Sequence, residues 1–357
     1  MWMTRISLVF MSIFLTLTGV ELGLRILDQP ESRVSGWKSR SNPVESNELG
    51  FRGQPIRYSD TDYVVVFVGD SQVEAEACAY EWLPEKRLEY YLGANTRVFS
   101  VGASGYGQDQ ELLALKEYFQ KYRADLVILW ETPANDIWNN LFPSSIPKAG
   151  TPKPTFRVVN GELVGPSEQI GEPVKPSHLR LVEILKTVTG WTRDQSWSDS
   201  LPEPYKPLTS YQGEVKHDWQ TEWDTDEYFR SSDLDSEKAD MMISLTPRSP
   251  RMQYGLDLTR VLIREVEKTA NNHGAKFIAF SHDRLRPDGV ELLNGKYYVT
   301  STSQLTENVD YMNQGFKFYW IPVTIENWRV GPQNGHLNEH AVDQLMKALA
   351  AKTRESR

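Results

Sequence analysis

A continuous run of β-branched and aromatic residues, Tyr63-Val64-Val65-Val66-Phe67-Val68, is the sequence feature that most constrains the fold. A strand with one solvated face alternates apolar and polar side chains, but this run carries no charged or amide side chain on either face. It therefore predicts a strand over 63–68 that is buried on both faces, as in a parallel sheet covered by helices. The run ends at Gly69-Asp70-Ser71.

Further apolar runs repeat this rhythm along the chain. Strands are expected at 97–101, 126–130, 276–280 and 316–323, and helices at 72–94, 108–122, 255–272, 302–313 and 338–352. Strands that alternate with helices indicate an α/β fold, a doubly wound (flavodoxin-like) parallel sheet of about five strands flanked by helices.

The N-terminus has the pattern of a targeting segment. Arg5 precedes the uncharged stretch Ile6–Val20, and no small-x-small cleavage site follows. We predict an uncleaved signal anchor or transmembrane helix over 1–27, with the remainder exported to a periplasmic or extracytoplasmic compartment. A cleaved signal peptide and a buried core helix are the alternatives.

The remaining chain divides into a tether and a domain that contains an insertion. Residues 28–60 are polar and broken by prolines, which predicts a tether, and 61–357 form the domain. Residues 141–253 interrupt the α/β rhythm with a proline-rich, acidic and Trp-bearing insertion, expected to be a solvated excursion or a lid. The net charge of −9 excludes a nucleic-acid backbone as the main partner, because phosphate binding needs clustered Lys and Arg.

Polar or glycine-rich turns follow three of the predicted strands. The carboxyl ends of parallel strands share one edge of the sheet, so these turns and a fourth cluster before the last helix should meet there. The four segments are Gly69-Asp70-Ser71, Gly102-Ala103-Ser104-Gly105, Ala134-Asn135-Asp136 and Asn334-Gly335-His336-Leu337-Asn338.

In their order and placement the four segments resemble the four blocks of the SGNH (GDSL) hydrolase superfamily. The resemblance implies that Ser71 is the nucleophile and His336 the general base. It also implies an oxyanion hole made by the Ser71 and Gly105 backbone N–H groups and the Asn135 side chain. The usual glycine of the third block is Pro133 here. Chemistry of this kind needs no cofactor and no metal ion.

The segment Asn47–Gly53, which follows the predicted anchor, is similar to membrane-anchored bacterial members of that superfamily. Several such relatives act on cell-surface polysaccharides beside membrane acyltransferases. This resemblance implies an ester or glycan substrate, and a membrane acyltransferase as partner.

One residue departs from the superfamily pattern. Asn334, or Gln333 on the longer spacing, stands where an Asp orients the histidine. Three interpretations follow: a backbone carbonyl orients His336, another carboxylate such as Glu339 or Asp283 replaces the Asp, or turnover is weakened or lost.

Other polar residues have simpler explanations. His340 follows His336 at a spacing that can bind metal, but the sequence places no third ligand, so we predict no metal site. Ser104 is a weaker candidate nucleophile than Ser71.

Two functions remain open on the sequence. One is a serine esterase or O-acyltransferase that forms an acyl-Ser71 intermediate on an ester, such as an acetylated cell-surface glycan. The alternative is a binding or assembly protein of a surface-polysaccharide system that retains the scaffold without efficient turnover.

Overall fold

The computed structural model describes most of the predicted domain. The described residues are 45–141, 151–167, 250–284, 317–331 and 334–356, with the shorter stretches 5, 11–12, 15–23, 144–145, 245–246, 291–293 and 297–299. Most of the predicted insertion and the helix expected at 302–313 lie outside these ranges.

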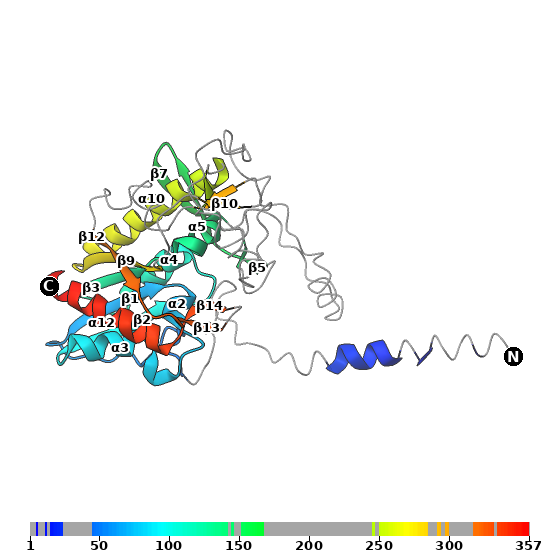
Figure 1. Cartoon of the computed structure of the whole chain (residues 1–357), viewed down its shortest axis with the longest axis horizontal. Coiled ribbons are helices and arrows are strands. Elements are labelled where there is room, and N and C mark those ends of the chain that lie inside the picture. Colours follow the sequence, from blue (N-terminus) through cyan, green and yellow to red (C-terminus); the bar gives the residue numbers. More distant parts are fainter. Residues whose placement is uncertain are drawn as a thin grey trace.

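The centre of the fold is a five-stranded parallel sheet (Figure 1). The strand order is β12-β9-β3-β1-β2, so the chain starts inside the sheet and winds outward in both directions. This confirms the predicted parallel α/β fold of five strands. The strands are β1 (Tyr63–Gly69), β2 (Thr96–Gly102), β3 (Leu126–Trp130), β9 (Lys276–Arg284) and β12 (Lys317–Val323).

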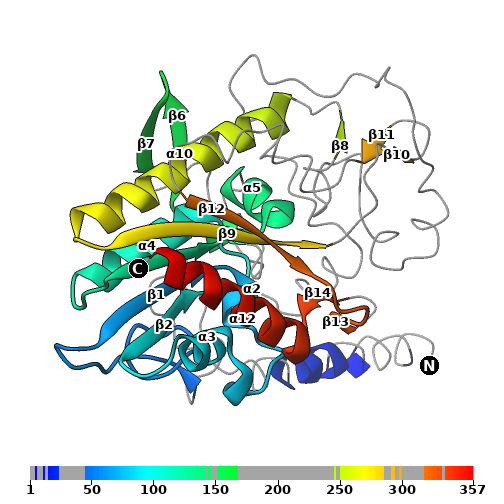
Figure 2. The ribbon, with the colours of Figure 1, turned by 60° about the vertical axis from the view of Figure 1, so that its left-hand side comes forward.

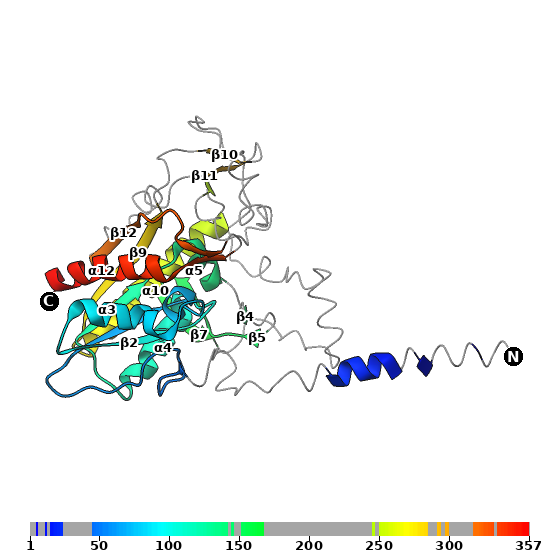
Figure 3. The same cartoon turned by 60° about the horizontal axis from the view of Figure 1, so that its bottom comes forward.

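Helices cover both faces of the sheet, as Figure 2 shows. Alternate residues of β1 enter opposite cores, with Val66 in one and Phe67 in the other. The Val66 core is closed by α4 (Gln108–Phe119), α5 (Pro133–Leu141) and α10 (Pro250–Asn272). The Phe67 core is closed by α2 (Ser71–Glu74), α3 (Pro84–Leu92) and α12 (Glu339–Ser356), and α3 and α12 lie side by side in Figure 3. The run at 63–68 is therefore apolar throughout because each face of β1 meets a separate core.

The single helix expected over 72–94 is wrong. The chain forms the four-residue helix α2, then a 3₁₀ turn, η2 (Tyr80–Trp82), and then α3. Ala75 adopts a left-handed conformation with φ of 46°, which ends α2. Pro84 occupies the first turn of α3, where its missing N–H costs nothing.

Residues 45–56, expected to belong to the tether, pack on the domain. Leu49, Phe51 and Ile56 are buried in the same core as Val66. We call residues 45–54 the N-terminal strap. The strap runs along β2, which is the edge strand of the sheet.

Side chains take the place of a neighbouring strand along the free edge of β2. The N–H of Val98 donates to Glu89 Oε2 at 2.9 Å, and its carbonyl accepts from Gln54 Nε2 at 2.7 Å. The N–H of Ser100 donates to Glu85 Oε2 at 2.5 Å, and its carbonyl accepts from Asn47 Nδ2 at 2.8 Å. The strap and α3 thus satisfy four backbone groups that an edge strand normally leaves to water.

Short antiparallel pairs lie outside the main sheet. The pair β6 (Thr155–Val159) and β7 (Glu162–Ser167) packs beside α10, and β13 (Arg329–Gly331) pairs with β14 (Asn334–Leu337). Two other small sheets have strands of two or three residues. In one, β4 (Ser144–Ser145) pairs with β5 (Thr151–Pro152); in the other, β11 (Tyr297–Val299) lies between β8 (Leu245–Thr246) and β10 (Glu291–Leu293).

Residues 15–23 near the N-terminus are helical and mostly exposed. Among the described residues, no helix combines the length and apolar character needed to cross a membrane. Residues 6–10 and 13–14 of the predicted anchor lie outside the described ranges.

Candidate active site

Ser71 lies at the carboxyl end of β1, as the first residue of α2. Asp70 is the N-cap of this helix, and its carboxylate accepts a hydrogen bond from the N–H of Gln72 at 2.9 Å. This bond satisfies one of the free amides of the first turn. Ser71 itself is 9% exposed, so its hydroxyl sits at the floor of the site and not on an open surface.

His336 faces Ser71 although the two residues are far apart in the chain. Its Nε2 lies 2.8 Å from Ser71 Oγ, and its Nδ1 lies 2.5 Å from Oδ1 of Asn334. Both His336 and Asn334 belong to β14, a short strand that the sequence did not indicate. The structure therefore brings together Ser71 and His336, expected as nucleophile and base, and Asn334, which stands where the superfamily pattern has Asp.

The amide orientation of Asn334 follows from a second contact. Its Oδ1 also accepts the backbone N–H of His336 at 3.0 Å, and a backbone N–H can only donate. The atom that faces the imidazole is therefore the oxygen. A neutral imidazole must then carry its proton on Nδ1, which leaves the Nε2 lone pair to accept from the Ser71 hydroxyl.

Among the groups whose atoms the structure describes, neither a backbone carbonyl nor Glu339 is hydrogen-bonded to Nδ1 of His336. The side chain of Asn334 itself holds Nδ1, where we had expected a backbone carbonyl or a different carboxylate. Glu339 instead accepts from the N–H of Ala79 at 2.8 Å. The side chain of Asp283 lies outside the described residues.

The turn that contains Gly105 follows β2 and lies next to the Ser71 turn. In the sheet register Gly69 is paired with Gly102, so both turns leave the same edge. A Cβ on Gly102 would collide with the carbonyl oxygen of Gly69, which explains the glycine at this position. The N–H of Tyr106 closes the turn on the carbonyl of Ala103 at 3.1 Å.

Gly105 has a φ of 74° at the third position of this turn. A positive φ at that position defines a type II turn, in which the central peptide is flipped relative to a type I turn. Glycine adopts this conformation at no steric cost, so residue 105 permits the turn that is seen here.

Asn135 lies in the first turn of α5, directly after β3, where we had expected only a turn. Its side chain is outside the described residues. The neighbouring residue Thr132 donates to Asp70 Oδ1 at 3.3 Å, so the segment after β3 contacts the cap of α2.

The helix α2 thus contacts all the other segments of the site. Asp70 contacts Thr132, Gln72 Oε1 accepts from the N–H of Leu337 at 3.3 Å, and Glu74 binds Ser104. Sequence reasoning missed Gln72 and Glu74, because their roles depend on partners that are distant in the chain.

Buried carboxyl groups lie behind the site. Asp109 pairs with Lys153 at 2.6 Å, and both side chains are at most 1% exposed. Glu111 and Asp136 are fully buried. Desolvation, followed by repulsion from neighbouring carboxylates, raises the pKa of each well above its usual range. Within the described ranges, no group of three or more His, Cys, Asp or Glu residues is arranged to hold a metal ion.

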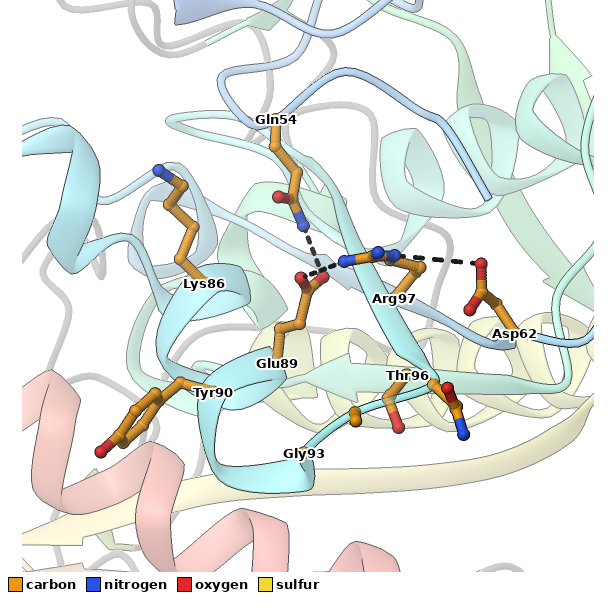
Figure 4. Close-up of a pocket in the computed structure, with 10 residues that line it drawn as sticks. Gln54, Asp62, Lys86, Glu89, Tyr90, Gly93, Thr96 and Arg97 are labelled. Atoms are coloured by element: carbon orange, nitrogen blue, oxygen red, sulfur yellow. Dashed lines mark hydrogen bonds and ion pairs between the residues drawn. The ribbon is translucent and has the colours of Figure 1, made fainter. Parts of the chain in front are cut away.

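A cavity of about 580 Å³ lies elsewhere, between the end of α3 and the start of β2 (Figure 4). Its charged lining is internally paired, with Arg97 between Glu89 at 3.1 Å and Asp62 at 3.9 Å. None of the predicted site residues lines it. Ser71 is at the opposite end of the strands.

His340, considered above for metal binding, is exposed, and its ring meets the edge of Trp82 with centroids 6.3 Å apart. His282 is buried at the end of β9 and accepts a hydrogen bond from Trp130 Nε1 at 3.2 Å. Neither contacts Ser71 in the hydrogen bonds of the described residues.

No protein-family model matches the chain, and no curated protein matches it in sequence. Solved structures to which the chain shows similarity include a protein assigned as an arylesterase from Agrobacterium tumefaciens, with 14% identity, a TM-score of 0.37, and coverage of 82% of this chain and 99% of that one. A carbohydrate acetylesterase from Sinorhizobium meliloti has 12% identity, a TM-score of 0.36, and coverage of 83% and 100%. An acetyl xylan esterase from the rumen bacterium Butyrivibrio proteoclasticus has 12% identity, a TM-score of 0.33, and coverage of 85% and 66%.

Proposed function

We propose that this chain is a serine esterase or O-acyltransferase that forms an acyl-Ser71 intermediate. One observation carries the proposal: Nε2 of His336 lies 2.8 Å from Ser71 Oγ while Asn334 holds the other ring nitrogen. A serine hydroxyl is a poor nucleophile until a base takes its proton during attack. An imidazole that titrates near neutral pH is suited to that task.

In the proposed reaction Ser71 Oγ attacks the ester carbonyl and its proton passes to His336 Nε2. The tetrahedral intermediate collapses, the carbon–oxygen bond to the alcohol breaks, and the same proton goes to the departing oxygen. Water, or a sugar hydroxyl, then gives its proton to His336 and attacks the acyl carbon. The bond from that carbon to Ser71 Oγ breaks, and His336 returns the proton to Oγ. The product is an acid in hydrolysis and a new ester in transfer.

The negative charge of the intermediate needs hydrogen-bond donors. We assign this role to the backbone N–H groups of Ser71 and Gly105 and to the amide of Asn135. A donor in such a position typically lowers the barrier by about 3–4 kcal/mol.

The orienting group is neutral in this site. The carbonyl oxygen of Asn334 selects the imidazole tautomer that a base requires, but it provides less stabilisation to the imidazolium than a carboxylate would. We therefore propose a working but slow catalyst, in which the tautomer is correct and the electrostatic assistance is small.

The substrate class and the location rest on sequence. The resemblance to membrane-anchored bacterial members and the predicted export favour an acetylated cell-surface glycan as substrate. They also favour a membrane acyltransferase as partner and attachment to the membrane through 1–27.

A fluorophosphonate probe tests the proposal directly, because it phosphonylates only an activated serine. The full-length chain, purified in detergent, should be labelled, and the label should map to Ser71 by peptide mass spectrometry. Ser71→Ala and His336→Ala should not be labelled. Failure of the folded wild-type chain to react would refute the proposal.

The same protein preparation tests the alternative of a binding or assembly protein. Binding of an acetylated glycan that is equal in the wild type and in Ser71→Ala, without release of acetate, would support that alternative. Acetate release that depends on Ser71 would exclude it.

A further inference from the structure

Glu74 is a buried carboxylate of the nucleophile helix that the proposed chemistry does not use. It is 2% exposed and directed at the turn after β2. Its Oε2 accepts two hydrogen bonds from one residue, from the backbone N–H of Ser104 at 2.6 Å and from the Ser104 hydroxyl at 2.5 Å. Hydrogen bonds to an ionised acceptor are about twice as strong as neutral ones.

Ser104 is the residue before Gly105, so Glu74 acts on the turn that presents the Gly105 N–H. Glycine permits the type II conformation seen here, but it also permits the flipped type I conformation, in which the central peptide turns round. The identity of residue 105 alone therefore does not fix the direction of its N–H. The Glu74 contact holds the backbone N–H and the hydroxyl of Ser104, the residue on one side of that central peptide.

The position of Glu74 is itself fixed by Arg52 of the N-terminal strap. The Arg52 guanidinium, 7% exposed, donates to the carbonyls of Ala75 and Cys78, the latter at 2.9 Å, and pairs with Glu45 at 2.8 Å. These carbonyls belong to residues that follow α2, and the left-handed conformation of Ala75 ends that helix. The strap thus holds the end of the helix from which Glu74 extends.

We propose that Glu74, held by Arg52, is a positioning residue that locks the Ser104–Gly105 turn against the nucleophile helix and so aims the Gly105 N–H at the reacting carbonyl oxygen. The proposal rests on the proposed function, because it takes Gly105 as an oxyanion donor. Glu74 does not touch the substrate in this scheme.

A matched pair of variants tests this role. Glu74→Ala removes the acceptor, whereas Glu74→Gln keeps an oxygen that can accept both Ser104 bonds, since only one carboxylate oxygen is used. We expect Glu74→Ala to lower kcat about 10- to 100-fold, below the loss of a whole oxyanion donor. KM should change less than about threefold and the acidic limb of the pH–rate profile should stay in place, because the Ser71–His336–Asn334 contacts are intact.

Glu74→Gln should recover most of the lost kcat, and Glu76→Ala, the same change at an exposed neighbouring glutamate, should have no effect. If Glu74→Ala keeps its kcat, or if Glu74→Gln is as slow as Glu74→Ala, the proposal is overturned. Should Glu74→Ala not fold, Ser104→Ala takes its place. It removes the hydroxyl donor alone and should lower kcat about 3- to 10-fold, and an unchanged kcat would overturn the proposal.

Crystal structures of the variants provide a test that does not depend on activity. Glu74→Gln is compared with Glu74→Ala, or with Ser104→Ala if Glu74→Ala does not fold. We expect Gly105 to keep its positive φ in Glu74→Gln and to leave it, or to occupy two conformations, in the variant that loses the contact. An unmoved turn in that variant overturns the positioning role. A turn that moves in a chain whose wild type shows no fluorophosphonate labelling supports positioning and refutes the proposed function instead.

Discussion

Replacement of Asn334 by Asp introduces a carboxylate beside His336, and under the proposed function it should accelerate turnover. In the structure Asn334 Oδ1 is 2.5 Å from Nδ1 and 3.0 Å from the backbone nitrogen of His336. An Asp in the same rotamer places one oxygen at the same point. The geometry and the imidazole tautomer are thereby retained, and only the charge changes.

The size of the gain follows from the charge that the imidazole acquires during attack. Two unit charges about 4 Å apart attract by about 1 kcal/mol in water and by about 4 kcal/mol at the effective dielectric near a protein surface. His336 is half-buried, so the value for this site should lie between these limits. A stabilisation of about 2 kcal/mol corresponds to a rate increase of roughly 30-fold.

This gain should fall well short of the effect known for serine proteases, where replacement of the Asp by Asn lowers turnover about 10⁴-fold because the wrong tautomer forms. Here Asn334 already selects the correct tautomer. The carboxylate also stabilises the protonated imidazole of the free enzyme, so the acidic limb of the pH–rate profile should move to higher pH. The increase should therefore be largest above that limb.

The assay is hydrolysis of p-nitrophenyl acetate by the full-length chain, with kcat/KM measured across the pH range for wild type and Asn334→Asp. Gln344→Glu adds the same charge on α12 at a side chain that contacts Thr324, and it should leave the profile unchanged. Asn334→Ala removes the acceptor and should be slower than wild type. An Asn334→Asp enzyme with no gain at alkaline pH and an unmoved acidic limb would refute the role assigned to this contact.

Three further outcomes concern stability. Burial raises the pKa of Glu85 from 4.5 to about 7. The protonated carboxyl therefore contributes on the order of 3 kcal/mol to the free energy of unfolding below about pH 4.5, and this contribution is lost as the pH rises through 7. The urea midpoint of the wild type should fall as the pH rises, and the midpoint of Glu85→Gln should depend less on pH. Parallel curves for the two proteins would contradict this role of Glu85. Gly102→Ala should lower the free energy of unfolding by about 2–3 kcal/mol, since the added methyl group collides with the Gly69 carbonyl, and an unchanged thermal midpoint would show that the strands can part there. Lys153→Met should lower the free energy of unfolding by about 3–5 kcal/mol, because it leaves the buried Asp109 carboxylate unpaired. Adding Asp109→Asn to the same chain should recover part of that loss in chemical denaturation. Failure to recover any of it would show that the loss has another cause.

The strand β1 could be predicted because consecutive apolar residues indicate burial on both of its faces. Val64, Val65 and Val66 need no partner information to indicate a doubly covered strand, and the structure places them in β1 with no exposure. The break of the following helix could not be foreseen in the same way. The left-handed Ala75 is supported by the Arg52 guanidinium, which lies 23 residues earlier in the chain.

The site shows the same division. Ser71, His336 and Asn334 could be singled out from their motifs, but the acceptor role of Asn334 depends on the rotation of one amide. That rotation is set by a backbone N–H in a strand that has no apolar pattern. Lys153 and Asp109 were missed for a different reason: charged residues predict a solvated surface, and their burial is understandable only as a pair.

The side chains along the free edge of β2 also bear on self-association of the protein. An open strand edge can recruit a strand from another chain, which leads to sheet extension and aggregation. Gln54 and Asn47 occupy the edge on the strap side, so a chain cut just before β1 would lose both. Such a shortened chain would expose the unpaired edge of β2 and the apolar surface that Phe51 covers, and it should aggregate. A truncated chain intended for expression in soluble form should therefore keep the residues from Glu45 onward.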